Sequence, residues 1–125
     1  MRMRTIAMLV VMSGAALGAS HAAAAPTYGS ETLTYKIPTR AGTLHAEVVH
    51  ATLNGKIAKV PAILTLSPYS ALGRNGDATR WVPKGYHRVW VDLPGTGDSG
   101  GCFDYGAARE KKAGYDSVEW IAKQK

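Results

Sequence analysis

The sequence predicts an α/β fold in which an antiparallel hairpin leads into a mostly parallel sheet flanked by helices, incomplete within these 125 residues. Three observations predict it. Two early stretches, 31–37 and 44–51, alternate apolar and polar side chains, as half-buried strands do. Two later stretches, 60–66 and 86–91, are short and almost continuously apolar, which is typical of strands covered on both faces. Helical patterns follow each of these later stretches, and that alternation indicates parallel strands.

The hairpin comes first along the chain. Leu33, Tyr35 and Ile37 share one face of its first strand. A turn is expected at 38–42, because it begins with proline and ends with a glycine that tolerates a positive φ. The second strand then returns, and the Asn-Gly pair at 54–55 predicts the next turn.

A short helix is expected between the two buried strands, over residues 77–82. Asn75 or Asp77 would cap its start, because a short polar side chain can accept a bond from a free backbone N–H. Pro83 and Gly85 would end it.

The last predicted element is a helix from Ala107 onward. Its expected apolar face consists of Tyr115, Val118, Ile121 and Ala122. That face requires a sheet larger than these few strands. We therefore expect the chain to be the N-terminal part of a longer domain, with no internal repeat.

Residues 1–24 have the pattern of a signal peptide. Arg2 and Arg4 form a basic start, residues 6–17 are apolar or small, and the small residues at 20–24 suit a cleavage site. The apolar run is shorter than the roughly 20 residues of a spanning helix, although an uncleaved anchor is the alternative. We expect residues 25–125 to be a secreted or periplasmic domain with no membrane association after cleavage.

Composition limits the partners and cofactors. The formal charge is +6, but lysine and arginine are scattered and no basic stripe with interleaved aromatics occurs, so no nucleic-acid partner is expected. We expect no metal and no cofactor. Cys102 is the single cysteine, which excludes a disulfide within the chain and leaves its partner open. The oligomeric state is also open.

The glycine-rich segment 95–101 contains the most conspicuous serine, Ser99. Residues 97–101 spell the nucleophile motif of trypsin-like proteases, but no histidine lies in a suitable upstream segment. The G-x-S-x-G pattern also fits, yet four residues separate the strand from the loop, and a nucleophile elbow allows no such gap. A phosphate-binding loop would need a lysine that is absent. We interpret the segment as a structural turn braced by Ser99 and Asp98.

Residues 92–99 resemble the D-x-R-G-x-G-x-S loop of α/β-hydrolases, with Asp92, Gly95, Gly97 and Ser99 in matching positions. Further matches in the same order belong to the CocE/NonD hydrolases, the group that contains cocaine esterase and X-Pro dipeptidyl-peptidases. They are Ile37–Leu44, Pro68-Tyr69, Gly85-Tyr86 and Glu119–Gln124. Together these motifs cover nearly all of residues 31–124.

The resemblance implies a serine hydrolase that cleaves a small ester, amide or peptide substrate through an acyl-enzyme. Tyr69 matches the tyrosine whose hydroxyl, with one backbone N–H, stabilises the oxyanion in this family. The residues alone favour a simpler role for Tyr69, packing at a strand end. Two departures stand out: Pro94 replaces the usual arginine and removes a possible buried ion pair, and Ala41 replaces an aspartate of the hairpin turn.

In this family the nucleophile, aspartate and histidine follow in that order after the helix that ends here. We therefore expect the 125-residue chain to lack all three and to be inactive by itself. The alternative is a small exported binding protein, or a remnant of a hydrolase, without catalytic activity.

Overall fold

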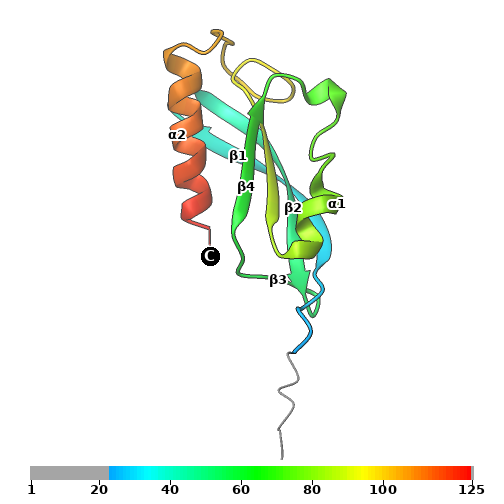
Figure 1. Ribbon diagram of the computed structural model, residues 1–125. Helices are drawn as coiled ribbons and strands as arrows, with labels where there is room; N and C mark the ends of the chain where they lie inside the picture. Colours follow the sequence, from blue (N-terminus) through cyan, green and yellow to red (C-terminus); the bar gives the residue numbers. More distant parts are fainter. Residues whose placement is uncertain (1–22, 125) are drawn as a thin grey trace, which may run out of the picture.

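The computed structural model describes residues 23–124, which form one mixed sheet with helices on both sides (Figure 1). The strands are β1 (Gly29–Thr39), β2 (Gly42–Leu53), β3 (Lys56–Ile57), β4 (Ala62–Ser67) and β5 (His87–Asp92). The helices are the 3-10 turns η1 (Ser70–Leu72) and η2 (Val82–Lys84) and the α-helices α1 (Ala78–Trp81) and α2 (Ala108–Ala122). The signal-peptide prediction falls almost wholly on residues 1–22, outside the described part. No helix within residues 23–124 is both long enough and apolar enough to cross a membrane.

The predicted hairpin is confirmed. Strand β1 pairs antiparallel with β2 over its whole length, and the pair Thr39–Gly42 closes the turn. At the next turn Asn54 and Gly55 have φ values of 52° and 74°. Two successive positive φ values match the right-handed twist of a hairpin, which is why the Asn-Gly pair predicts this turn correctly.

The change from antiparallel to parallel pairing occurs at β5. This strand pairs antiparallel with β2 on one side and parallel with β4 on the other, giving the order β1-β2-β5-β4. The expected mixed sheet is therefore present. The prediction that residues 60–66 are covered on both faces is wrong, because β4 lies at the edge of the described sheet and its residues are only half-buried or exposed.

The short helix predicted over residues 77–82 is present as α1 (Ala78–Trp81), but its predicted cap is wrong. Neither Asn75 nor Asp77 caps it through a side chain. The Asp77 carboxylate instead accepts a 2.6 Å bond from Arg88 Nε, and the Asn75 amide donates to the Glu47 carbonyl. After η2, Gly85 adopts φ 84° and ends the helical region as predicted.

Helix α2 packs on one face of the sheet, and its predicted apolar face is partly wrong. Tyr115 and Val118 are 62% and 55% exposed and Ala122 is also exposed, whereas Ala113 and Ser117 are fully buried. With Ile121, which packs against the core, the buried pair forms a stripe at intervals of four residues. Small side chains let the helix approach the strands closely, and this sets its rotation.

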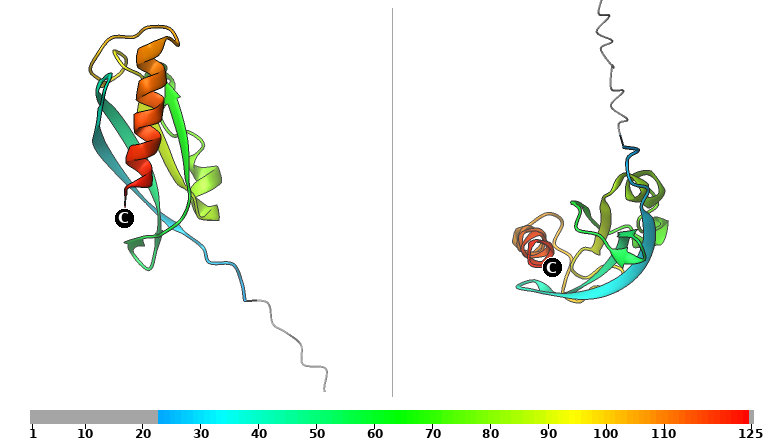
Figure 2. Two further views of the ribbon diagram at one scale, coloured as in Figure 1. Left: turned by 90° about the vertical axis from the view of Figure 1, so that its left-hand side faces the viewer. Right: turned by 90° about the horizontal axis from the view of Figure 1, so that it is seen from below.

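Helices α2 and α1 lie on opposite faces of the sheet (Figure 2), and an apolar cluster on each face holds the layers together. The larger cluster lies under α2 and the smaller one lies under α1. The buried members of the larger cluster are Ile37, Leu44, Ala46, Val48, Val89, Val91 and Ala113. The buried members of the smaller cluster are Ala51, Ala78 and Val82.

Candidate functional site

The carboxyl ends of β4 and β5 lie side by side, because the two strands are parallel and pair up to Ser67 and Asp92. Beyond the ends of these two strands the chain forms two loops, residues 68–77 and 93–106 (Figure 1). Ligands of α/β folds bind at the carboxyl ends of the strands. The carboxyl ends of β4 and β5 are therefore the candidate site, and they contain most of the residues that the sequence singled out.

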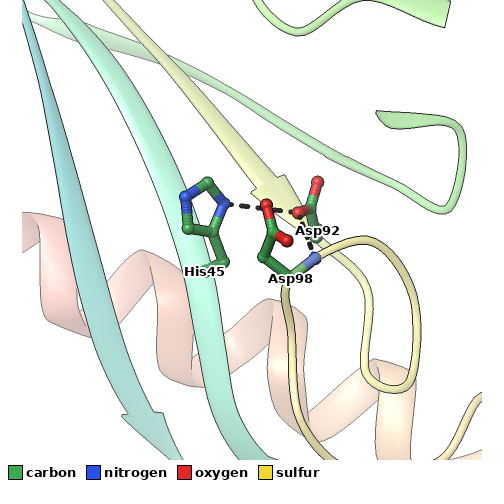
Figure 3. Close-up of side chains that lie close together, drawn as sticks. All are labelled: His45, Asp92 and Asp98. Carbon is green, nitrogen blue, oxygen red and sulfur yellow. Dashed lines mark hydrogen bonds and ion pairs between the residues drawn. The ribbon is translucent and has the colours of Figure 1, made fainter. Parts of the chain in front are cut away.

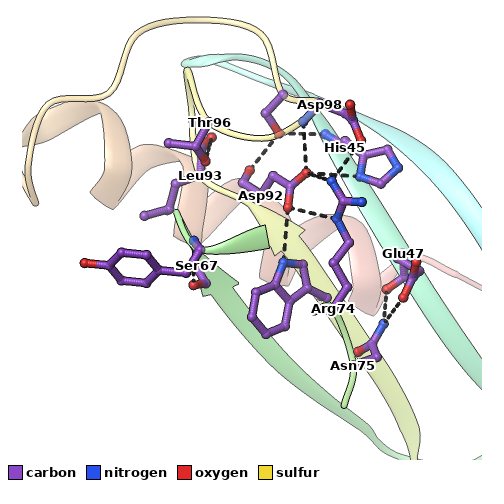
Figure 4. Close-up of polar contacts among 12 residues, drawn as sticks. His45, Glu47, Ser67, Arg74, Asn75, Asp92, Leu93, Thr96 and Asp98 are labelled. Carbon is purple, nitrogen blue, oxygen red and sulfur yellow. Dashed lines mark hydrogen bonds and ion pairs between the residues drawn. The ribbon is translucent and has the colours of Figure 1, made fainter. Parts of the chain in front are cut away.

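Asp92 is the centre of the polar network at this edge (Figure 4). Its side chain is 0% exposed and accepts bonds from Arg74 Nε (3.2 Å) and Nη2 (2.6 Å), from Trp90 Nε1 (3.1 Å) and from the Asp98 amide (3.1 Å). Burial is the largest single influence on the pKa of Asp92 and by itself raises it. The four bonds and the charge of Arg74 together outweigh burial and hold the pKa below its usual value. Asp92 is therefore a buried carboxylate that stays ionised.

Arg74 is the residue that the sequence analysis missed. Its Nη2 also donates to Asp98 Oδ2 at 2.8 Å, and the hydrogen bond to Asp92 raises its pKa further above the usual value. The buried ion pair that Pro94 was expected to remove is therefore present at Asp92, with its guanidinium supplied by the preceding loop. No pattern in the sequence marks Arg74, since its partners lie 18 and 24 residues away.

Three potential metal ligands meet in this network. One ligand atom each of His45, Asp92 and Asp98 lies within 4.8 Å of the others, and His45 Nδ1 is 3.3 Å from Asp92 Oδ2 (Figure 3). The guanidinium of Arg74 already binds both carboxylates. A metal ion would have to displace that cation, so the geometry favours an ion-pair network here.

The hydroxyl of Ser99 is engaged on both sides. Its Oγ donates to the Asp92 carbonyl at 2.7 Å and accepts from the His45 amide at 2.8 Å. Within residues 23–124, no histidine ring is hydrogen-bonded to a serine hydroxyl. These contacts suit the bracing of a turn and do not suit a nucleophile activated by an imidazole.

Glycines 95 and 97 let the loop after β5 pack tightly against its neighbours. They adopt φ values of 72° and 51°. A Cβ at Gly95 would lie 2.6 Å from the Phe103 amide nitrogen. A Cβ at Gly97 would collide with the Asp92 carboxylate and lie 2.7 Å from Ser70 Oγ. Gly95 therefore lets the loop fold closely on itself, and Gly97 lets it approach Asp92 and the loop after β4. Cys102, in the same loop, is free and exposed.

Tyr69 lies two residues after the end of β4. Its amide donates to Ser67 Oγ at 3.1 Å, and the residue is 65% exposed at the edge formed by the strand ends. The exposure leaves its phenol available to a group that binds at this edge.

Comparisons with known proteins agree with this architecture. The family model for X-Pro dipeptidyl-peptidase (S15 family) matches residues 42–125. A relative from Streptomyces avermitilis, named a putative Xaa-Pro dipeptidyl-peptidase, is 35% identical over 83 residues, which cover 50% of this chain and 12% of the relative.

Solved structures show the same fold. An α/β serine hydrolase without lid from Xanthomonas campestris superposes with a TM-score of 0.58 and 22% identity, covering 80% of this chain and 48% of that one. A CocE/NonD family hydrolase from Staphylococcus aureus gives a TM-score of 0.58 and 21% identity, covering 80% and 24%. The chain thus spans less than half of each of these relatives.

Proposed function

The chain belongs to the X-Pro dipeptidyl-peptidase (S15) family, and from that premise we propose that it is the N-terminal part of a serine hydrolase that cleaves peptide bonds. The resemblance to CocE/NonD hydrolases is thereby confirmed at the level of the family. The proposed chemistry is acyl transfer through an acyl-enzyme. The preference for a peptide over an ester or another amide is supported by the family's description and by the name of the Streptomyces relative.

The position of Tyr69 is the observation that carries the proposal. An acyl-enzyme forms through a tetrahedral intermediate whose oxygen bears a negative charge, and a hydrogen-bond donor directed at that oxygen lowers the barrier. The residue is 65% exposed beside the ends of two parallel strands. We assign its hydroxyl as one oxyanion donor, to be joined by a backbone N–H. Loss of one such donor typically costs about 100- to 1,000-fold in rate.

The topology also indicates where a nucleophile would enter. Strand β5 is followed by α2, which packs on one face of the sheet, and a further parallel strand would pair with the open edge of β4. A nucleophile elbow begins at the carboxyl end of its strand. The nucleophile would then stand beside Tyr69. In this proposal the nucleophile, aspartate and histidine all come from sequence beyond Lys125, and the 125-residue chain alone is inactive.

Export is the second part of the proposal. The basic start, apolar run and small residues of positions 1–24 support cleavage of a signal peptide and a secreted or periplasmic location. N-terminal sequencing of the product from medium or periplasm tests it. A product that still begins at Met1 and sediments with membranes would support the uncleaved anchor instead.

A fluorophosphonate probe, which labels activated serines, tests the catalytic proposal. The reading frame is first sequenced past the codon for Lys125, and the 125-residue chain and the extended product are then compared. We expect labelling of the extended product only, at a rate that Tyr69→Phe lowers and Ser99→Ala does not change. Labelling of the 125-residue chain that Ser99→Ala abolishes would refute the proposal. A stop codon directly after Lys125 would favour the non-catalytic binding protein.

A further inference from the structure

Arg74 connects the two loops that border the candidate site. Its guanidinium donates to both oxygens of Asp92, at 3.2 and 2.6 Å, and to one oxygen of Asp98 at 2.8 Å. Asp92 ends β5 and Asp98 lies in the following loop, whereas Arg74 comes from the loop after β4. The side chain of Arg74 is only 21% exposed. The arginine therefore ties the loop of Tyr69 to the neighbouring strand.

Asp92 is a rigid anchor for this contact. Its carboxylate is 0% exposed and is also held by Trp90 Nε1 and by the Asp98 amide. The residue itself belongs to β5, which is paired on both sides. A group bonded to this carboxylate is therefore fixed relative to the sheet.

The segment that carries Tyr69 has few other attachments. The turn η1 contains no buried residue, and its bonds, from the Leu72 amide to the Tyr69 carbonyl and from the Gly73 amide to the Ser70 carbonyl, lie within the segment. Ser70 also packs close to Gly97. Within residues 23–124, Arg74 is the first residue after Tyr69 whose side chain is hydrogen-bonded to another element.

We propose that Arg74 is a positioning residue, which holds Tyr69 at the carboxyl end of β4 by fastening the intervening turn to Asp92. The inference rests on the proposed function, in which the Tyr69 hydroxyl is an oxyanion donor. Such a donor must lie about 2.7–3.1 Å from the oxyanion, and a displacement of about 1 Å can cost on the order of 100-fold in rate. Arg74 touches no reacting atom and acts only through Tyr69.

The test variant is Arg74→Lys in the complete hydrolase. Lysine keeps the charge beside Asp92 but cannot offer the planar set of donors that reaches three oxygens at once. We expect kcat to fall about 10- to 100-fold with KM changed less than about twofold. The matched control is Arg40→Lys, which alters another arginine–aspartate pair, with Asp116, and is expected to keep wild-type kinetics.

A double-mutant cycle with Tyr69→Phe decides whether Arg74 acts through Tyr69. In the Tyr69→Phe background, Arg74→Lys should lower kcat by no more than about twofold, because the hydroxyl it positions is already gone. An equal loss in both backgrounds would overturn the inference, since Arg74 would then act independently.

A spectroscopic measurement on the 125-residue chain separates this inference from the proposed function. We expect ¹⁵N relaxation to show increased motion of the amides of residues 69–73 in Arg74→Lys, with those of α2 unchanged as an internal control. Unchanged amides at residues 69–73 would overturn the inference. If Tyr69→Phe leaves kcat unchanged while these amides do loosen, the oxyanion role of Tyr69 is wrong and the fastening by Arg74 stands.

Discussion

The replacement of Arg88 by alanine should destabilise the fold more than that of any surface arginine. Arg88 is 5% exposed, and its guanidinium donates to Asp77 Oδ1 at 2.6 Å, Thr65 Oγ1 at 2.7 Å, and the carbonyls of Val89 at 3.0 Å and Ile63 at 3.1 Å. It thereby joins the start of α1 to both parallel strands. Alanine removes all four bonds and most of the side-chain volume at once.

The expected loss in the free energy of unfolding for Arg88→Ala is about 3–4 kcal/mol. Each buried acceptor left without a donor costs about 1–3 kcal/mol, but the Asp77 carboxylate is 46% exposed and can bind water instead, which lowers the sum. Arg88→Lys keeps the charge and part of the volume, so its loss should be about 1–2 kcal/mol. The two values test whether the bonds, and not the charge alone, stabilise this contact.

Urea denaturation followed by tryptophan fluorescence measures both variants, with Trp81 reporting on α1 itself. Arg40→Ala is the control, because Arg40 pairs with Asp116 on the surface at 59% exposure and should change the midpoint far less. An Arg88→Ala protein within about 1 kcal/mol of the wild type would refute the reasoning.

Three further predictions concern pH and the loop after β5. Burial lowers the pKa of His50 and of His87 below 6.5 in the folded protein. In mild acid the unfolded chain therefore binds more protons than the folded chain, so the urea midpoint should be constant above pH 6.5 and should fall below it. A midpoint that stays flat down to pH 5 would contradict the burial of both rings. A second pH effect comes from Asp92, whose pKa in the folded protein is lower than its ordinary value of 3.8. The ionised Asp92 therefore stabilises the fold above pH 3.8, and this stabilisation is lost as the pH falls through the pKa that Asp92 has in the folded protein. Asp92→Asn should remove that acid-dependent loss while lowering stability at pH 7, and acid titrations that are parallel in the two proteins would argue against it. Gly97→Ala should lower the free energy of unfolding by at least about 1–2 kcal/mol, because the residue has φ 51° and its Cβ would meet Asp92 and Ser70. Gly55→Ala also has a positive φ, 74°, but meets no atom within 4 Å, so the difference between the two variants isolates the collision.

The features that depend on neighbouring residues could be predicted from the amino-acid sequence. The hairpin follows from side-chain alternation, and the two later strands follow from short apolar runs. The Asn54-Gly55 turn and the end of the helical region at Gly85 follow from the φ values that glycine and asparagine allow. These constraints act within a few residues, so the local pattern is enough to predict them. The motifs that resemble CocE/NonD hydrolases also lie in short stretches, and they predicted the family correctly.

The side chains that face each other could be identified only from the three-dimensional arrangement of the elements. The side of α2 that is buried depends on the close approach of Ala113 and Ser117 to the strands, and hydrophobicity alone pointed to Tyr115 and Val118. Asp77 was expected to cap a helix, but the buried guanidinium of Arg88, which comes from strand β5, binds its carboxylate instead. Arg74 and Asp92 are 18 residues apart and meet only because β4 and β5 are parallel and end at the same edge. Such pairings depend on the three-dimensional path of the chain, and no spacing along the sequence encodes them.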